Sequence, residues 1–126
     1  MIGYPKGPTR AAIKAQKREH ETQVIKAVRF ACMKRDGHCR VAGRVGTPCY
    51  GPSEWAHLGD HRRARTRGRD PEERHDVRFS VMLCRLHHHD YDAHAYDLAY
   101  DPERGANGPV TVVLGGRRVA DPVRSH

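Results

Sequence analysis

Residues 84–92 read CRLHHHDYD, and this segment constrains the fold more than any other part of the chain. It places one thiol, three consecutive imidazoles and two carboxylates directly after the apolar residues 81–83. Such a density of ligand-type side chains is more typical of metal binding than of a packed core. We therefore expect a helix that starts here, runs to about Tyr91 and serves two metal ions, with the remaining ligands supplied by the rest of the chain.

The composition favours one small domain that needs a stabilising element besides its core. Only 37% of the 126 residues are apolar and 30% are charged, so little of the chain can be buried. A domain this polar often depends on a bound metal. We expect a single domain over residues 1–126, with an N-terminal helix in 1–36, a metal-binding core in 37–95, and a hairpin and tail in 96–126.

The chain is strongly basic, because 23 Lys and Arg oppose 15 Asp and Glu for a net charge of +8. All lysines lie at or before Lys34, so the remainder is basic through Arg, whose guanidinium group suits bidentate phosphate contacts. Nucleic acid is the expected partner, and charge that only maintains solubility is the alternative. Residues 59–77 contain six Arg and no aliphatic residue larger than alanine before Val77, which predicts an exposed loop that guides a phosphate backbone. Its candidate DNA-contacting residues are Arg62, Arg63, Arg65, Arg67 and Arg69.

The sequence carries no export or membrane signal. The N-terminus lacks the apolar core of a signal peptide, and no stretch is long and apolar enough to span a bilayer. Without an export signal, the four cysteines are expected to be metal ligands or buried thiols rather than disulfides. We therefore expect a cytoplasmic protein.

The clearest helix covers residues 10–35, which lack Gly and Pro and carry apolar side chains at spacings of three and four. Thr9 is its expected N-cap, and Gly37 is expected to end it. Cys32 falls on the apolar stripe of this helix, so we expect it in the core and not among the metal ligands.

The remaining pattern predicts short strands. Residues 55–58 (WAHL) form one, and residues 94–100 and 110–114 form a C-terminal β-hairpin across the turn-rich residues 101–109. The polar tail, residues 115–126, is expected to fray. The predicted fold class is therefore α+β.

Three cysteines and one histidine form the expected structural metal site. Cys39 and Cys49 lie in a loop rich in Gly and Pro, with nine residues between them, which is longer than the usual zinc spacing. Cys84 and His87 supply a C-x-x-H pair, and the four together have the number and types of ligand that tetrahedral zinc requires. Binding would contribute directly to folding.

His88 is expected to face a second site. Consecutive helical residues point about 100° apart, so His88 and His87 do not share one tetrahedron. Asp92 lies four residues on, on the same helix face as His88. A His and a carboxylate so placed can hold a divalent cation with open positions for substrate oxygens.

The motifs RDGHC (35–39), AHL (56–58) and LCRLHH (83–88) resemble, in this order, the HNH endonuclease family of His-Me (ββα-metal) finger nucleases. The resemblance covers roughly residues 24–95 and is to zinc-knuckle members, which phages and mobile elements commonly encode. It implies a small zinc-stapled ββα-metal finger that acts as a metal-dependent DNA endonuclease or nickase. Weak or structure-based sequence preference is expected, because no base-reading element is identifiable.

The resemblance also implies residue roles. His57 would be the general base that deprotonates water for attack on phosphorus. His88 would bind the catalytic ion, Mg²⁺ or another divalent metal, while Cys84 and His87 would complete the zinc site. A neutral imidazole suits general-base work at neutral pH.

Three features depart from the family pattern, and one of them is the wide spacing of Cys39 and Cys49. Ala56 stands where the family often has an Asp or His that binds the metal, and Phe79 stands where it has its middle Asn. Another ligand would then compensate, and the candidates are Asp92 first, with Asp60 or His61 second.

Three alternatives stay open on the sequence alone. His57 could be a metal ligand with His61 as the base. The chain could be a non-catalytic zinc-stapled nucleic-acid-binding module on the same finger, or a toxin nuclease domain with an immunity partner.

Overall fold

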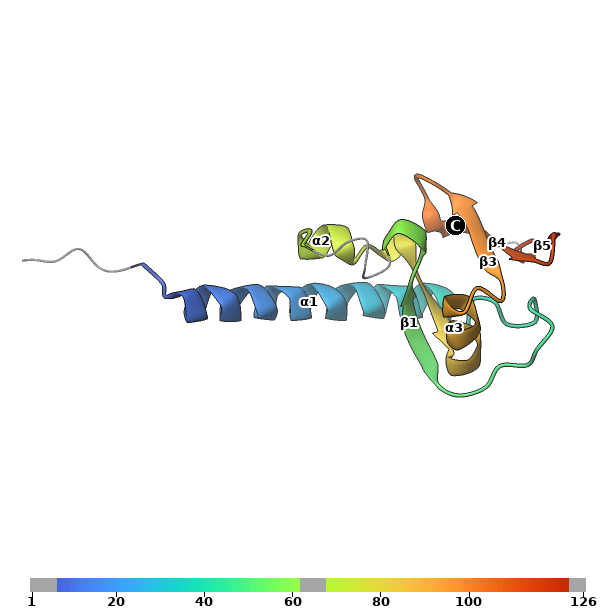
Figure 1. Ribbon diagram of the computed structural model, residues 1–126, viewed down its shortest axis with the longest axis horizontal. Helices are drawn as coiled ribbons and strands as arrows, with labels where there is room; N and C mark the ends of the chain where they lie inside the picture. The colour runs from blue at the N-terminus through green and yellow to red at the C-terminus, as the bar shows by residue number, and fades with distance from the viewer. Residues whose placement is uncertain (1–6, 62–67, 123–126) are drawn as a thin grey trace, which may run out of the picture.

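The computed structural model describes residues 7–61 and 68–122, and it has the predicted α+β class. Two small antiparallel sheets, of strand order β1-β2 and β3-β4-β5, lie beside one long N-terminal helix (Figure 1). Within the described ranges, no helix is long and apolar enough to span a membrane. The helical elements are α1 (Arg10–Asp36), η1 (Gly59–His61), α2 (Pro71–Arg74), η2 (Val77–Phe79) and α3 (Arg85–Asp92). The strands are β1 (Ser53–His57), β2 (Ser80–Cys84), β3 (Asp97–Asp101), β4 (Gly105–Leu114) and β5 (Arg117–Val119).

Helix α1 begins and ends as its sequence predicts. The hydroxyl oxygen of Thr9 accepts a hydrogen bond from the backbone N–H of Ala12 at 3.1 Å, which satisfies one of the free N–H groups of the first turn. Gly37 follows the helix with a φ of 73°, a left-handed conformation that glycine adopts without a steric penalty. The N-terminal half of α1 extends well beyond the rest of the protein (Figure 1).

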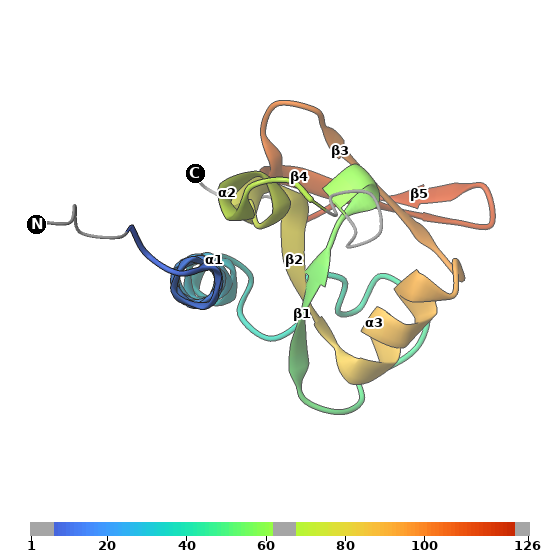
Figure 2. The same cartoon turned by 60° about the vertical axis from the view of Figure 1, so that its left-hand side comes forward.

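Strands β1 and β2 lie between α1 on one side and α3 on the other (Figure 2). They pair in antiparallel register, so that Ala56 lies opposite Val81 and His57 opposite Ser80. Ala56 is 1% exposed and packs in the core with Leu58 and Val81. The chain leaves β2 and enters α3 without a connecting loop, which places Cys84 at the N-cap of that helix.

The predicted C-terminal hairpin is the first two strands of a three-stranded sheet. Strand β4 starts at Gly105, earlier than the turn-rich sequence suggested, and its buried Val110 and Val112 face the core. The expectation of a fraying tail is wrong for residues 117–121. Strand β5 pairs with β4, and the Asp121 side chain is only 1% exposed because it forms ion pairs with buried arginines.

The prediction that residues 59–77 form one exposed loop is also wrong for its described part. Helix α2 packs against α1, and the next residue, His75, is 8% exposed. Its hydrogen-bond partners lie in α1 and β1, far away in the sequence, and no local pattern indicates them.

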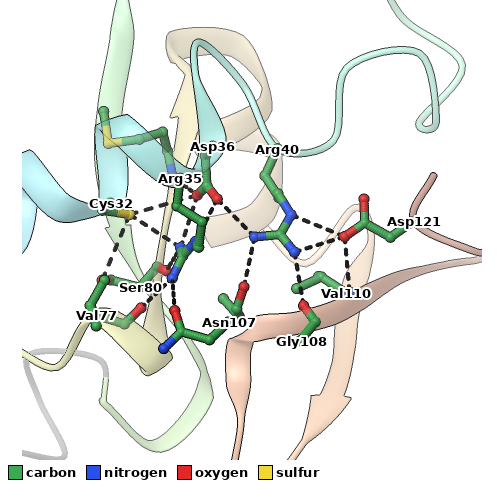
Figure 3. Close-up of polar contacts among 12 residues, drawn as sticks. Cys32, Arg35, Asp36, Arg40, Val77, Ser80, Asn107, Gly108, Val110 and Asp121 are labelled. Carbon is green, nitrogen blue, oxygen red and sulfur yellow. Dashed lines mark hydrogen bonds and ion pairs between the residues drawn. The ribbon is translucent and has the colours of Figure 1, made fainter. Parts of the chain in front are cut away.

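The outer edge of β2 is closed by polar groups from the end of α1 (Figure 3). One carboxylate oxygen of Asp36 accepts the backbone N–H of Met82 at 3.0 Å, and the backbone N–H of Arg40 donates to the carbonyl of Met82 at 2.8 Å. The Arg35 guanidinium donates to the carbonyl of Ser80 at 2.6 Å. Because β2 is fully buried, these groups replace a missing neighbouring strand.

Arg40 connects this edge to the second sheet. Its guanidinium pairs with Asp36 and Asp121, each at 2.7 Å, and donates to the carbonyls of Ala106 and Gly108 (Figure 3). Burial opposes ionisation of both carboxylates, but the neighbouring guanidinium groups and backbone N–H donors hold the pKa of Asp36 and of Asp121 below the ordinary value. This stabilisation is present above the unfolded Asp pKa of about 3.9 and is lost as the pH falls through the lower folded-state pKa.

We predict that Arg40→Ala lowers the free energy of unfolding by about 3–5 kcal/mol, because it leaves two buried carboxylates without this partner. The matched control is Arg85→Ala, which removes a 64% exposed guanidinium from a surface ion pair with Glu54. That change is expected to cost about 1 kcal/mol or less. Urea unfolding of the metal-loaded protein measures both, and equal effects of the two substitutions would contradict the assigned role of Arg40.

Candidate functional site

Cys39, Cys49, Cys84 and His87 come together as predicted, and they could hold a metal ion such as zinc. Their ligand atoms all lie within 4.8 Å of one another. Cys39 and Cys49 come from the loop between α1 and β1, whereas Cys84 ends β2 and His87 lies in the first turn of α3. The site therefore joins a long loop to the strand–helix junction.

The distances within this cluster fit a tetrahedral ion. The Nδ1 atom of His87 lies 3.4 Å from Sγ of Cys39 and 3.8 Å from Sγ of Cys49. Tetrahedral zinc with Zn–S bonds of about 2.3 Å and Zn–N bonds of about 2.0 Å separates its ligands by roughly 3.5–3.8 Å. The other ring nitrogen, Nε2, lies 3.1 Å from the carbonyl oxygen of Thr47. A proton on Nε2 that is donated to Thr47 leaves Nδ1 bare for a metal, as such ligands require.

The thiols differ in how easily they ionise. Burial and the nearby Cys39 sulfur raise the pKa of Cys49 to about 12. Burial also opposes ionisation of Cys84, but the backbone N–H groups of His87 and Tyr50 donate to its sulfur and hold its pKa below the ordinary value. A cation would stabilise all three thiolates together, which explains why thiols can gather here without a disulfide.

Cys32 lies outside this cluster, as its position on the apolar face of α1 predicted. It is fully buried, and its thiol contacts Asp36 and Ser80 instead of another ligand. Burial raises the pKa of Cys32 to about 12, so this thiol stays protonated at neutral pH.

His88 faces away from the Cys₃His cluster and lies between two carboxylates. Its Nε2 atom is 3.5 Å from a carboxylate oxygen of Asp92, the predicted neighbour one helical turn on. Its Nδ1 atom is 3.0 Å from Oε1 of Glu54 on β1, a contact that the sequence analysis missed. Only the position of Glu54 at the start of a strand next to the helix could have suggested it. The Glu54 carboxylate fixes a proton on Nδ1 and leaves Nε2 directed toward Asp92.

His57 ends β1 on the opposite strand face from Ala56. Its ring centroid lies 4.5 Å from that of Trp55, and its Nε2 atom lies 3.0 Å from Nδ1 of His75. Burial, followed by the nearby basic side chains of His75, His61, Arg74 and His88, lowers the pKa of His57 to about 4. The imidazole is therefore neutral at physiological pH, in the form that can accept a proton.

The alternate base, His61, is less favourably placed than His57. The ring of His61 stacks on Phe79, with centroids 4.1 Å apart and an interplanar angle of 10°. Phe79, which stands at the family's Asn position, therefore packs against rings and offers no ligand atom. Nothing is described for the side chain of Asp60.

Most of the predicted DNA-contacting arginines, Arg62, Arg63, Arg65 and Arg67, lie outside the described residues. Arg69 is exposed and lines a groove of about 630 Å³ between α1 and the α2 segment. The basic residues of this groove are Lys14, Lys17, Arg18, Arg69 and Arg74.

Comparison with protein-family models, with curated proteins and with solved structures finds no match for this chain.

We predict that the purified protein contains about one zinc ion per chain and that Cys84→Ser abolishes this binding. Cys32→Ser is the matched control, because it makes the same exchange at a buried thiol outside the cluster, and it is expected to keep the zinc. Elemental analysis by mass spectrometry measures the stoichiometry, and chelation is expected to lower the melting temperature of the wild type. A well-folded wild type without zinc would contradict the assignment.

Proposed function

We propose that this protein is a metal-dependent DNA endonuclease or nickase built on a ββα-metal finger with a structural zinc ion. One observation carries the proposal: β1 pairs with β2, and β2 leads directly into α3, with His57 at the end of β1 and His88 beside the last ligand of the Cys₃His cluster. Strand β1, which ends at His57, packs against α3, which carries His88. The candidate base and the candidate metal ligand therefore belong to one small region.

His88 and Asp92 would hold the catalytic divalent ion. Both lie on the outer face of α3, with Asp92 61% exposed, so the remaining coordination positions would be open to water and phosphate oxygens. Glu54 would orient His88 through Nδ1. With Ala56 buried in the core, this pair takes the place of the ligand that the family often has there.

The reaction would consume one water molecule. His57 accepts a proton from that water, the water oxygen forms a bond to phosphorus, and the phosphorus–oxygen ester bond opposite breaks. The leaving oxygen takes a proton from solvent. When bound, the divalent ion would stabilise the negative charge on the phosphoryl and leaving oxygens.

The groove between α1 and α2 supports a DNA substrate. Its five basic side chains, named above, outnumber its acidic ones, Glu21, Asp70 and Glu72. Its Arg74 is adjacent to His75, which contacts His57, so the groove leads toward the candidate base. A phosphate backbone along it would contact charges and no specific bases, which fits weak sequence preference.

We predict that the wild type cleaves supercoiled plasmid DNA in the presence of Mg²⁺ or Mn²⁺. His57→Ala and His88→Ala are each expected to lower the rate at least about 100-fold, the usual contribution of a general base or more. His89→Ala is the matched control for His88, because it removes the adjacent, exposed imidazole of the same helix. Separation of nicked, linear and supercoiled forms on agarose gels measures the rate and tells nicking from double-strand cutting.

The second candidate is a zinc-stapled DNA-binding module without catalysis. Ala56 in the core and Phe79 in a ring stack favour it, because neither position supplies a ligand. A wild type that binds duplex DNA but cuts none with Mg²⁺, Mn²⁺, Ni²⁺ or Zn²⁺ would decide for this function. Full cleavage by a folded His57→Ala variant would instead refute the role of that histidine.

A further inference from the structure

We propose that Glu21 and His75 are positioning residues that hold His57 in the tautomer with a proton on Nε2, so that its Nδ1 atom accepts the proton of the attacking water. This inference rests on the proposed function and deepens it. It assigns a role to two side chains that lie outside the motifs and whose meeting no sequence pattern indicates.

The three side chains form one continuous line of hydrogen bonds. Nε2 of His57 lies 3.0 Å from Nδ1 of His75, and Nε2 of His75 lies 3.0 Å from Oε1 of Glu21. They come from β1, from the residue after α2 and from the middle of α1. Packing of three separate elements is needed to bring them together.

The surroundings restrict both imidazole rings. The ring centroid of Trp55 lies 4.5 Å from that of His57 and 5.5 Å from that of His75. His75 is 8% exposed, so its ring does not exchange this hydrogen bond for water readily. Arg74 donates to the same Oε1 atom of Glu21 at 2.9 Å and fixes the carboxylate in place.

The proton positions follow from the acceptor at the end of the line. An ionised carboxylate only accepts hydrogen bonds, so Nε2 of His75 carries a proton and donates it to Glu21. A neutral His75 then has a bare Nδ1 atom, which accepts the N–H of His57 Nε2. His57 is left with its bare nitrogen at Nδ1, and no hydrogen bond within the described part of the chain engages that atom.

The number of protons on His75 decides which nitrogen of His57 is bare. A second proton on His75 would make its Nδ1 a donor, and His57 would then carry its proton on Nδ1 and lose its function as a base there. The Arg74 guanidinium also pairs with the Glu21 carboxylate, at 2.9 Å, so this carboxylate binds both Arg74 and His75. After His57 accepts a proton from water, the Glu21 carboxylate stabilises the resulting imidazolium through His75.

The test combines an NMR measurement with single-turnover cleavage. Long-range ¹H–¹⁵N correlation of the histidine rings, with His57 assigned from a His57→Gln sample, reports its tautomer at pH 7. We expect the Nε2–H form in the wild type. Glu21→Ala and His75→Ala are expected to give a mixture of tautomers and to lower the cleavage rate at saturating DNA about 10- to 100-fold.

Two further variants make the result specific. Glu21→Gln keeps an acceptor for His75 but removes the negative charge, so it is expected to retain the tautomer with a rate between those of the wild type and Glu21→Ala. Glu19→Ala removes an exposed carboxylate from the same helix and is expected to behave as wild type. The two alanine variants remove different members of the line, its end at Glu21 and its middle at His75, so a folding failure of one leaves the other to decide.

The outcomes separate this inference from the proposed function. Wild-type cleavage that persists unchanged in Glu21→Ala and His75→Ala would overturn the relay and leave the nuclease intact. An altered tautomer with an unchanged rate would overturn it as well. If the wild type cuts no DNA, the proposed function fails, and an Nδ1–H tautomer of His57 in the wild type would refute the relay independently.

Discussion

The fold depends on the hydrogen bonds made to the edge of β2 that has no neighbouring strand. This strand is buried from end to end, yet only β1 pairs with it. Asp36 and Arg35, at the end of α1, bind its backbone N–H and carbonyl groups, and Arg40 ties the same carboxylate to the second sheet. Residues 35–37 (RDG), which resemble a family motif, therefore have a structural role: Arg35 and Asp36 bind the backbone of β2. They fix the strand from which α3, and with it both candidate metal sites, begins.

The direction of side chains at the start of α3 then separates two kinds of chemistry. His87 points inward to three thiols, and its Nε2–H donates to the backbone carbonyl of Thr47, as a structural ligand requires. His88, one residue later, lies between Glu54 and Asp92 on the outer face. On the neighbouring strand, His57 is linked through His75 to α1. A single strand–helix junction therefore positions the Cys₃His cluster, the proposed ligands of a catalytic ion and, on the paired strand, a candidate base.

Short sequence patterns correctly predicted the features that depend on local geometry, namely helix ends and the metal-ligand set. The ends of α1 at Thr9 and Gly37 and the Cys₃His set follow from residue type and spacing, because caps and zinc ligands have strict stereochemistry. The sequence did not reveal contacts between polar residues far apart along the chain. Asp121 looked like part of a frayed tail and His75 like part of an exposed loop. Both side chains are buried through their contacts with Arg40 and Glu21. These partners are distant in sequence and resemble ordinary surface charges, so no local pattern indicates the contacts.

The most direct test of the account is the location of two metals in one crystal. Crystals of the zinc-loaded protein soaked in Mn²⁺, measured at the absorption edges of both elements, give separate anomalous maps. The account predicts a zinc peak among Cys39, Cys49, Cys84 and His87, and a manganese peak beside Nε2 of His88 that also contacts Asp92. A zinc peak elsewhere, or manganese bound without His88, would contradict it.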